Sequence, residues 1–140
     1  MNLAEAAARA RAVTDRAEAS LASDCARAGA REFLAELHVT TPVETGALRA
    51  SEQIMGVSGG GTFATAVVGS DLIYAHFRNV GGTITSKGPW SLHSATTGQY
   101  FGRVVHQTGS HYMERAEAGA LETMQASMKA ILGEYIDGMF

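Results

Sequence analysis

The segment from Thr41 to Ser51 decides how the chain is organised, and it reads Thr41-Pro42-Val43-Glu44-Thr45-Gly46-Ala47-Leu48-Arg49-Ala50-Ser51. Before this segment the chain is rich in alanine, glutamate and arginine, and after it the chain is rich in glycine and poor in charge. A residue that precedes proline is disfavoured in the α-helical region, so Thr41-Pro42 ends the first element. The segment therefore marks the passage from a helix to a strand-rich region.

The other positions of this segment have structural uses. Thr45 can cap a new helical turn, and Gly46 permits a tight backbone beside it. Leu48 can point into a core, which leaves Arg49 free to reach a carboxylate, either Glu44 or one on a neighbouring copy. We therefore interpret the segment as a connector and expect no catalytic role for it.

One long helix is predicted upstream, over about residues 3–37, with Gly29 marking a break before a short apolar cluster. Small or apolar residues recur every three or four positions and line one face: Leu3, Ala7, Ala10, Val13, Ala17, Leu21, Cys25 and Ala28. Alanine favours a helix but buries little area, so this helix is weakly anchored by itself. We expect it to pack against the sheet or against another copy.

A β-hairpin is predicted directly after the connector. Residues 51–57 and 62–69 are the expected strands, and the glycine-rich residues 58–61 are the expected loop. Apolar or small side chains occupy both sets of alternating positions in the second strand. That pattern predicts a strand covered on both faces.

The rest of the middle region is less regular. Residues 71–80 fit a short helix about as well as a strand, and a returning strand is expected over residues 100–107. Between them, residues 86–99 form a stretch rich in serine, threonine and glycine. Loops of that length in a small domain are usually functional or disordered.

A second helix is predicted over about residues 112–136, with an apolar face at helical spacing. Ser110 is the candidate N-cap, and Glu114 and Glu117 lie near the positive end of the helix dipole. Gly138 is expected to end the helix.

Length and composition predict one domain over residues 1–140, with helix over 1–38, a strand-rich middle over 39–110 and helix over 111–137. The net charge of −3 lacks the basic excess of a protein that grips nucleic acid through its phosphates. The single cysteine excludes an intramolecular disulfide. No apolar run is long enough to span a membrane, and no secretory signal is recognised.

Side chains that could carry chemistry form no recognisable catalytic or metal motif. His106 and His111 lack the spacing of a helical zinc pair, so we predict no metal site. Cys25 lies on the apolar stripe of the first helix, where packing explains it. Gly59-Gly60-Gly61 precedes a threonine rather than the Lys-Ser/Thr of a phosphate loop. We therefore expect no catalytic residue, no cofactor and no enzyme activity.

Trp90 is the most informative residue of the predicted loop, because a large aromatic side chain follows Gly88-Pro89 in a polar stretch. It can fold back to cap the core, or it can anchor a partner, as tryptophan does at interface hot spots. The candidate interface residues are Trp90, Lys87, Tyr100, Arg49 and Glu44.

Three segments resemble a family of small tailed-phage proteins, known as tail-component, minor capsid or head–tail joining (tail completion) proteins. Residues 41–51 match its signature T-P-[VK]-[DE]-T-G-x-L-R-x-S, which follows a long N-terminal helix. Residues 68–82 resemble its V-G-S-x-x-x-Y-A-x-[YF]-x-E-x-G, and residues 111–116 resemble its P-[FY]-[ML]-x-P-A. Asn79 stands where the family has an acidic residue, and the two expected prolines are replaced by His111 and Arg115.

The resemblance and the residue patterns together imply an α+β fold. A long N-terminal helix and a C-terminal helix pack on a small antiparallel sheet of about four strands. The resemblance implies a structural virion protein that forms a ring in the neck of a long-tailed phage and joins the head connector to the tail. Six copies are favoured over twelve, and the partners are further copies and the adjacent connector, tail tube or terminator proteins.

The alternative within this class is a tail terminator that caps the tail tube. The alternatives from other classes are a small cytosolic enzyme, with a pocket lined by His76, His106 or His111, and a binding adaptor. Because the sequence shows no basic stripe, DNA is expected to pass the lumen of the ring without specific binding. The protein is expected in the virion, after synthesis in the host cytoplasm, and not in a membrane.

Overall fold

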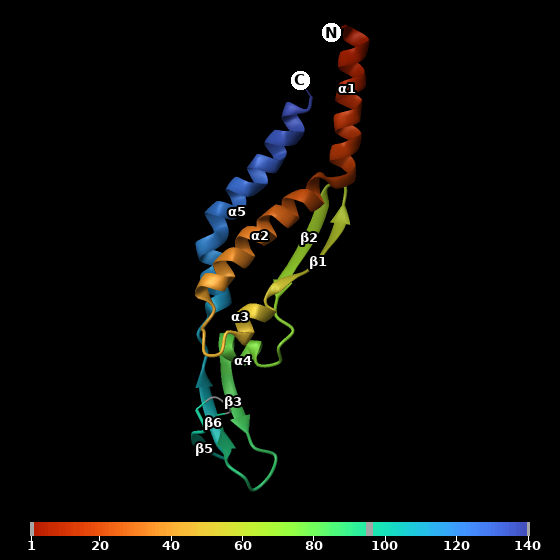
Figure 1. Cartoon of the computed structure of the whole chain (residues 1–140). Coiled ribbons are helices and arrows are strands. Elements are labelled where there is room, and N and C mark those ends of the chain that lie inside the picture. Colours follow the sequence, from red (N-terminus) through yellow and green to blue (C-terminus); the bar gives the residue numbers. More distant parts are fainter. Residues whose placement is uncertain (1, 95–96, 140) are drawn as a thin grey trace.

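The computed structural model describes residues 2–94 and 97–139, which form an elongated α+β structure (Figure 1). In chain order the elements are α1 (Leu3–Arg16), η1 (Ala17–Leu21), α2 (Ala22–Thr40), α3 (Ala47–Ser51), β1 (Gln53–Gly60), β2 (Phe63–Gly69), α4 (Ala75–Val80), β3 (Gly81–Thr85), β4 (Leu92–His93), β5 (Tyr100–Gly102), β6 (Val104–Thr108) and α5 (Tyr112–Asp137). Along the sequence, helices precede and follow a strand-rich middle, so the predicted α+β fold class is confirmed.

The predicted first helix is a continuous helical run that begins at Leu3 and ends at Thr40. A capping box between Asn2 and Glu5 begins it, and the π-helical turn η1 interrupts it where the helix bends (Figure 1). Thr41 leaves the helical region with φ −62° and ψ 126°, as the proline after it requires. The end of the helix was therefore predictable, whereas the bend was not.

Gly29 does not break the helix, contrary to the prediction. It lies within α2, and a Cβ atom built on it would meet the side chains of Met124 and Met128 on α5. The absence of a side chain at Gly29 lets α2 and α5 approach closely, which makes this glycine a packing residue.

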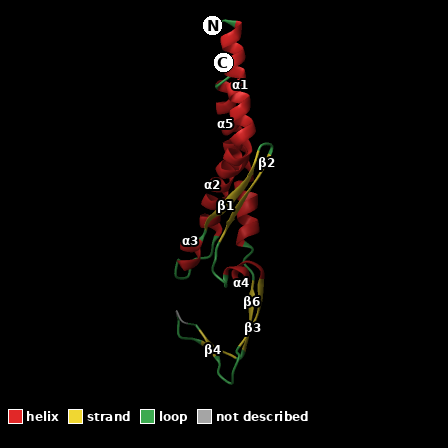
Figure 2. Ribbon diagram, turned by 90° about the vertical axis from the view of Figure 1, so that its right-hand side faces the viewer, coloured by secondary structure: helices red, strands yellow, loops and turns green. Residues whose placement is uncertain are grey.

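The predicted hairpin is present, but its turn is shorter than expected. Strands β1 and β2 pair antiparallel from Gln53↔Gly69 to Gly60↔Phe63, so only residues 61 and 62 form the turn. The hairpin lies against α2 on one face (Figure 2). Phe63 and Val67 are exposed on the opposite face, so the prediction of a strand covered on both faces is wrong.

The strands make three two-stranded antiparallel sheets within the described residues, in place of one sheet: β1–β2, β3–β6 and β4–β5. Residues 75–80 of the ambiguous stretch are helical. The returning strand is divided at Arg103 into β5 and β6. The predicted loop over residues 86–99 contains β4, and its residues 95 and 96 lie outside the described residues.

Helix α5 has nearly the predicted bounds, with Gly138 at its C-cap, but Ser110 does not cap it. The Ser110 backbone N–H and hydroxyl both donate to the Arg78 carbonyl, at 2.9 and 2.8 Å. His111 precedes the first helical residue with φ 52° and makes no side-chain cap. Ser110 therefore holds the chain against α4 instead.

Asn79, which belongs to another helix, α4, caps the N-terminus of α5 with its side chain. Its Oδ1 accepts a hydrogen bond from the Met113 N–H at 3.0 Å, and its Nδ2 donates to Glu114 Oε1 at 3.1 Å. The Asn79 carbonyl also accepts from the His111 N–H at 2.8 Å. A carboxylate could not donate to Glu114, so the amide suits this position where an acidic residue is usual in the resembling family.

The core is small and lies where α2, α3, α4 and α5 meet. Its fully buried members are Leu37, Leu48, Ala75, Tyr112 and Ala116, and Phe33, Leu34, Val68, Leu72 and Met113 pack around them. By contrast, none of the 14 residues of α1, all of which the structure describes, is buried. Most of the apolar burial therefore lies around the connector.

Alanine substitution should change the free energy of unfolding in opposite directions at two glycines. At Gly81, where φ is +80°, a Cβ would meet backbone atoms of Gln107, Thr108 and Gly109, so Gly81→Ala should lower the free energy of unfolding by about 2 kcal/mol or more. At Gly133, inside α5, a Cβ would meet nothing within 4 Å, so Gly133→Ala should raise it by about 0.5–1 kcal/mol.

Urea unfolding followed by circular dichroism measures both effects, with Gly133→Ala as the matched control. Equal stability of Gly81→Ala and the unmodified protein would contradict the placement of β3 against β6.

Candidate functional site

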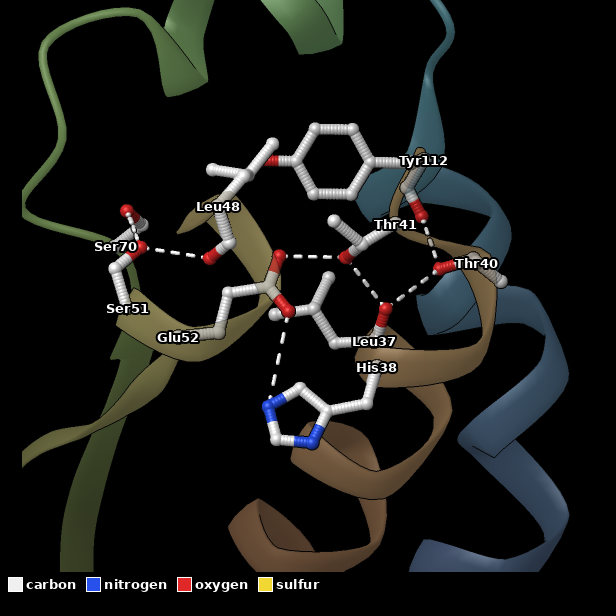
Figure 3. Close-up of polar contacts among 9 residues, drawn as sticks. All are labelled: Leu37, His38, Thr40, Thr41, Leu48, Ser51, Glu52, Ser70 and Tyr112. Carbon is white, nitrogen blue, oxygen red and sulfur yellow. Dashed lines mark hydrogen bonds and ion pairs between the residues drawn. The ribbon is translucent and has the colours of Figure 1, made fainter. Parts of the chain in front are cut away.

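The connector, residues 41–51, forms the junction of three helices. Thr41, after the last residue of α2, is 3% exposed, and Leu48 on α3 packs with Leu37 and Tyr112 in the core (Figure 3). The prediction that Leu48 points inward is therefore confirmed. Through these contacts the connector fixes α3 between α2 and the start of α5.

Glu52, which directly follows α3, places a carboxyl group inside this junction. Its side chain is fully buried, and its Oε1 lies 2.5 Å from the Thr41 hydroxyl oxygen. Burial raises the pKa of Glu52, while a Thr41 hydroxyl that donates to the ionised carboxylate and the charges of His38 and Arg49 oppose that rise. Burial has the largest influence, so the fold favours the protonated carboxyl.

The hydrogen bonds of the Thr41 hydroxyl also favour a protonated Glu52 carboxyl. The Thr41 hydroxyl oxygen lies 2.6 Å from the Leu37 carbonyl oxygen and 2.5 Å from Glu52, and each short contact needs a proton between its oxygens. Thr41 has only one hydroxyl proton, and the Leu37 carbonyl can only accept. Both contacts are satisfied when Glu52 supplies the second proton as a neutral carboxylic acid.

Three polar atoms around the carboxyl have no hydrogen-bond partner among the described residues. These are Glu52 Oε2, His38 Nε2, which lies 3.8 Å from it, and the Tyr112 hydroxyl. Burial, reinforced by the charges of Glu52 and Glu114, raises the pKa of Tyr112 to about 12. The Tyr112 hydroxyl is therefore a neutral, buried group.

A second hydrogen-bond chain ties α3 to the end of the hairpin. Ser51 Oγ donates to the Leu48 carbonyl at 2.7 Å, so the 2.6 Å contact between the Ser51 and Ser70 hydroxyls uses the Ser70 proton. Ser70 Oγ in turn accepts from the Leu72 N–H at 3.1 Å. Every proton in this chain has an acceptor, which positions the segment that leads into α4.

The other connector residues match the predicted local geometry only in part. Gly46 has φ +83°, as predicted, but Gly46 and not Thr45 is the N-cap of α3, which has no side-chain cap; Thr45 Oγ1 accepts only from the Ala47 N–H, at 3.3 Å. Glu44 pairs with Arg78 on α4 instead of Arg49. Arg49 is exposed on α3 and available to a carboxylate outside the chain.

An open cleft of about 750 Å³ lies between the connector and residues 81–109, which we call the distal arm. Figure 2 shows the arm below α4, with β4 on the side that curls back beneath α3. The cleft is lined by both parts: Glu44, Tyr74, Arg78, His93, Phe101 and His106. The connector and the arm therefore share one concave surface.

The arm presents two large aromatic side chains to solvent. Trp90 is 79% exposed and Tyr100 is 72% exposed, and Lys87 is also exposed. The alternative in which Trp90 caps the core is therefore wrong. Trp90, Lys87 and Tyr100 all belong to the arm, whereas Arg49 and Glu44 lie on the connector.

The histidines of the arm have structural partners. The Thr83 hydroxyl and His106 Nδ1 are 2.9 Å apart across β3 and β6, and the His93 ring lies 5.6 Å from the Tyr100 ring. Within residues 2–94 and 97–139, no three metal-ligating side chains cluster. In the same residues, no helix is long and apolar enough to cross a membrane.

An elongated chain with a small core and exposed aromatic residues has the features of an assembly subunit. The family model described as "Bacteriophage HK97-gp10, putative tail-component" matches residues 4–81, which is more than half of the chain. The chain belongs to this family of phage tail components. Comparison with curated proteins and with solved structures gave no match.

Sequence reasoning missed three buried polar side chains of the junction, Glu52, Asn79 and Tyr112, and the half-buried His38 beside Glu52. The available signal for Glu52 was its place directly before a stretch, Gln53 to Ser70, that contains no charged residue. For Asn79 the signal was its departure from the family pattern. Burial of a particular polar side chain depends on contacts between elements, so neither signal was decisive.

The raised pKa of Glu52 predicts a pH-dependent stability. The folded state holds the Glu52 proton more tightly than the unfolded chain, so its contribution is complete below about pH 4.5 and is lost as the pH rises through the folded pKa. Glu52→Gln keeps a donor for Thr41 and cannot ionise, so its unfolding free energy should exceed that of the unmodified protein increasingly above pH 4.5.

Urea unfolding of both proteins at several pH values tests this difference, because the other carboxyl groups are common to both. Parallel pH profiles would contradict a neutral Glu52.

Removal of the hydroxyl group should affect the unfolding free energy differently at two tyrosines of α5. Tyr135→Phe loses contacts with Ser20 at 2.7 Å and Asp24 at 2.6 Å, so it should lower the unfolding free energy by about 1–2 kcal/mol. Tyr112→Phe loses no hydrogen bond within the described residues, so it should be neutral or stabilising. Thermal unfolding compares them, and a larger loss for Tyr112→Phe would refute this account of the junction.

Proposed function

We propose that this tail component is a neck protein that forms a homo-oligomeric ring and joins the head connector to the tail. The observation that carries the proposal is the contrast between a small core at the connector and the uncovered surfaces at the two ends of the elongated molecule, helix α1 and the distal arm (Figure 1). A subunit that is completed by its neighbours is expected to leave such surfaces open.

Helix α1 supports contact between copies. Its alanine-rich stripe allows close approach of a partner, yet none of its described residues is buried within the chain. A closed cyclic ring needs two different patches on each subunit. Helix α1 and the acidic helix α5, which carries Glu114, Glu117, Glu122, Glu134 and Asp137, are the candidates.

The distal arm supports contact with an adjacent ring. Between Gly81 and Gly109 the chain contains Lys87 and Arg103 but no acidic residue. Together with exposed Trp90 and Tyr100, these charges suit an apolar surface with acidic surroundings on the adjacent connector, tail tube or terminator protein. Glu44, at the other wall of the cleft, and Arg49, which is exposed on α3, extend the same candidate interface.

The proposed ring contains six copies, with twelve as the alternative, and it belongs to the virion after synthesis in the host cytoplasm. Its lumen would pass DNA without specific binding, because phosphate affinity grows with the number of lysine and arginine contacts. The low charge of the middle region supports a lumen of this kind.

A tail terminator is the second candidate, because the matching family is described by its place in the tail. The two roles differ in what happens when the protein is absent. Loss of a joining protein leaves finished tails separate from filled heads, whereas loss of a terminator leaves tube polymerisation without a stop.

Replacement of the arm aromatics tests the joining role. Trp90→Ala with Tyr100→Ala should leave the fold and the oligomer intact but reduce joined particles at least about tenfold, since two hot-spot residues are removed. Electron microscopy of lysates counts joined particles, and mass photometry measures the oligomer.

Ile73→Ala is the matched control, because Ile73 is an exposed apolar residue outside the arm and should have no effect. Normal joining by the double variant, or a chain that stays monomeric and is missing from purified particles, would contradict the proposed function.

A further inference from the structure

The hairpin β1–β2 has two open edges. In the part of the chain that the structure describes, each strand pairs only with the other, so each keeps one edge of unpaired backbone groups. Proteins usually protect such edges with charged residues or proline, because an open edge can pair with another strand. From Gln53 to Ser70 the sequence contains neither.

A groove follows the open edge of β2. Its volume is about 730 Å³, and it is lined by the consecutive residues 62–68 but by no residue of β1. The remaining lining residues lie on α2 and α5 and include Cys25, Phe33, Met124 and Met128. A strand added to β2 would therefore lie over an apolar surface.

The outer face of the hairpin is also unoccupied. Helix α2 lies against the other face, and Phe63, Val67 and Met55 remain 73%, 52% and 53% exposed. Figure 2 shows the hairpin beside the helices, with β1 and β2 at the periphery. Both the edge and the outer face thus lack a partner in the chain itself.

We infer that β1 of one copy adds to the open edge of β2 in the next copy, so that the hairpins form one continuous sheet around the ring. The inference rests on the proposed ring function and specifies how its subunits meet. Neighbouring copies have the same orientation about the ring axis, and β1 runs opposite to β2, so the added strand is antiparallel. Each copy offers one edge of each kind, as a closed heterologous ring requires.

The area of the contact favours a second copy over a short peptide. A seven-residue strand is about 24 Å long and only one strand, about 5 Å, wide, so it covers far less than the roughly 800 Å² per partner of a stable interface. A second copy also brings η1 and α1, because β1 lies against η1 in the same chain. Neither edge carries a charge that would have to be desolvated.

One face of the hairpin is left to line the lumen in this arrangement. Helix α2 covers the other face, so the face with Phe63, Thr65 and Val67 is the one that the helices leave uncovered. That face carries no charge and would give DNA phosphates no lysine or arginine to bind.

Mixed disulfide formation tests the inference. Four proteins are made on a Cys25→Ser background, each with one new cysteine at an exposed position: Ser58→Cys, Phe63→Cys, Thr65→Cys and Val67→Cys. The Ser58→Cys protein is then mixed with each of the other three in turn. Neighbouring Cα atoms across paired strands lie within disulfide reach. The two single-cysteine proteins are unfolded together, refolded as mixed oligomers and oxidised, and dimers are separated by non-reducing electrophoresis.

A mixed Ser58→Cys dimer with at least one of the three partners is expected, and none is expected with Gln125→Cys on α5, the matched control. Oligomers without any mixed dimer would overturn strand addition but leave the ring proposal standing. A dimer of Ser58→Cys with itself would overturn the heterologous contact. A chain that forms no oligomer in solution or in particles would overturn both proposals.

Discussion

The burial of Glu52 against Thr41 is the interaction on which the arrangement of the chain depends. Thr41 ends α2, and Glu52 begins the path into β1, so their 2.5 Å contact closes the connector into a loop. With Leu37 and Tyr112 packed beside it, this loop fixes the directions in which the hairpin and α5 leave the junction. A buried carboxyl group specifies this geometry because few other positions offer it a partner.

Beyond the junction, the chain extends in two directions with little burial. Helix α1 and the distal arm are held by backbone continuity and by a few side-chain contacts, such as the Arg16 guanidinium 4.8 Å above the ring of Tyr135 on α5. Their exposed apolar residues are costly in water for an isolated subunit and stabilising in an assembly. In the proposed ring, the same distribution would let a short chain contact several neighbours, with its core at the junction and the interfaces at its two extremities.

Sequence reasoning succeeded where local rules act. Proline after Thr41 ended the helix, the alternation of small and apolar residues predicted the hairpin, and helical spacing predicted α5. It was wrong where two elements meet. Gly29 is explained by Met128 on another helix, Ser110 was displaced as a cap by Asn79, and the hairpin is covered on one face only.

By itself, the sequence determined the class of the fold, the place of the connector and the family, because proline, glycine and periodicity act over a few residues. Only the tertiary structure decided that Glu52 is buried and that the strands form separate pairs. It also decided that Trp90 stays in solvent and that both edges of the hairpin remain open. The reason is that burial and strand pairing depend on residues far apart in the chain, and their contacts exist only once the helices have packed.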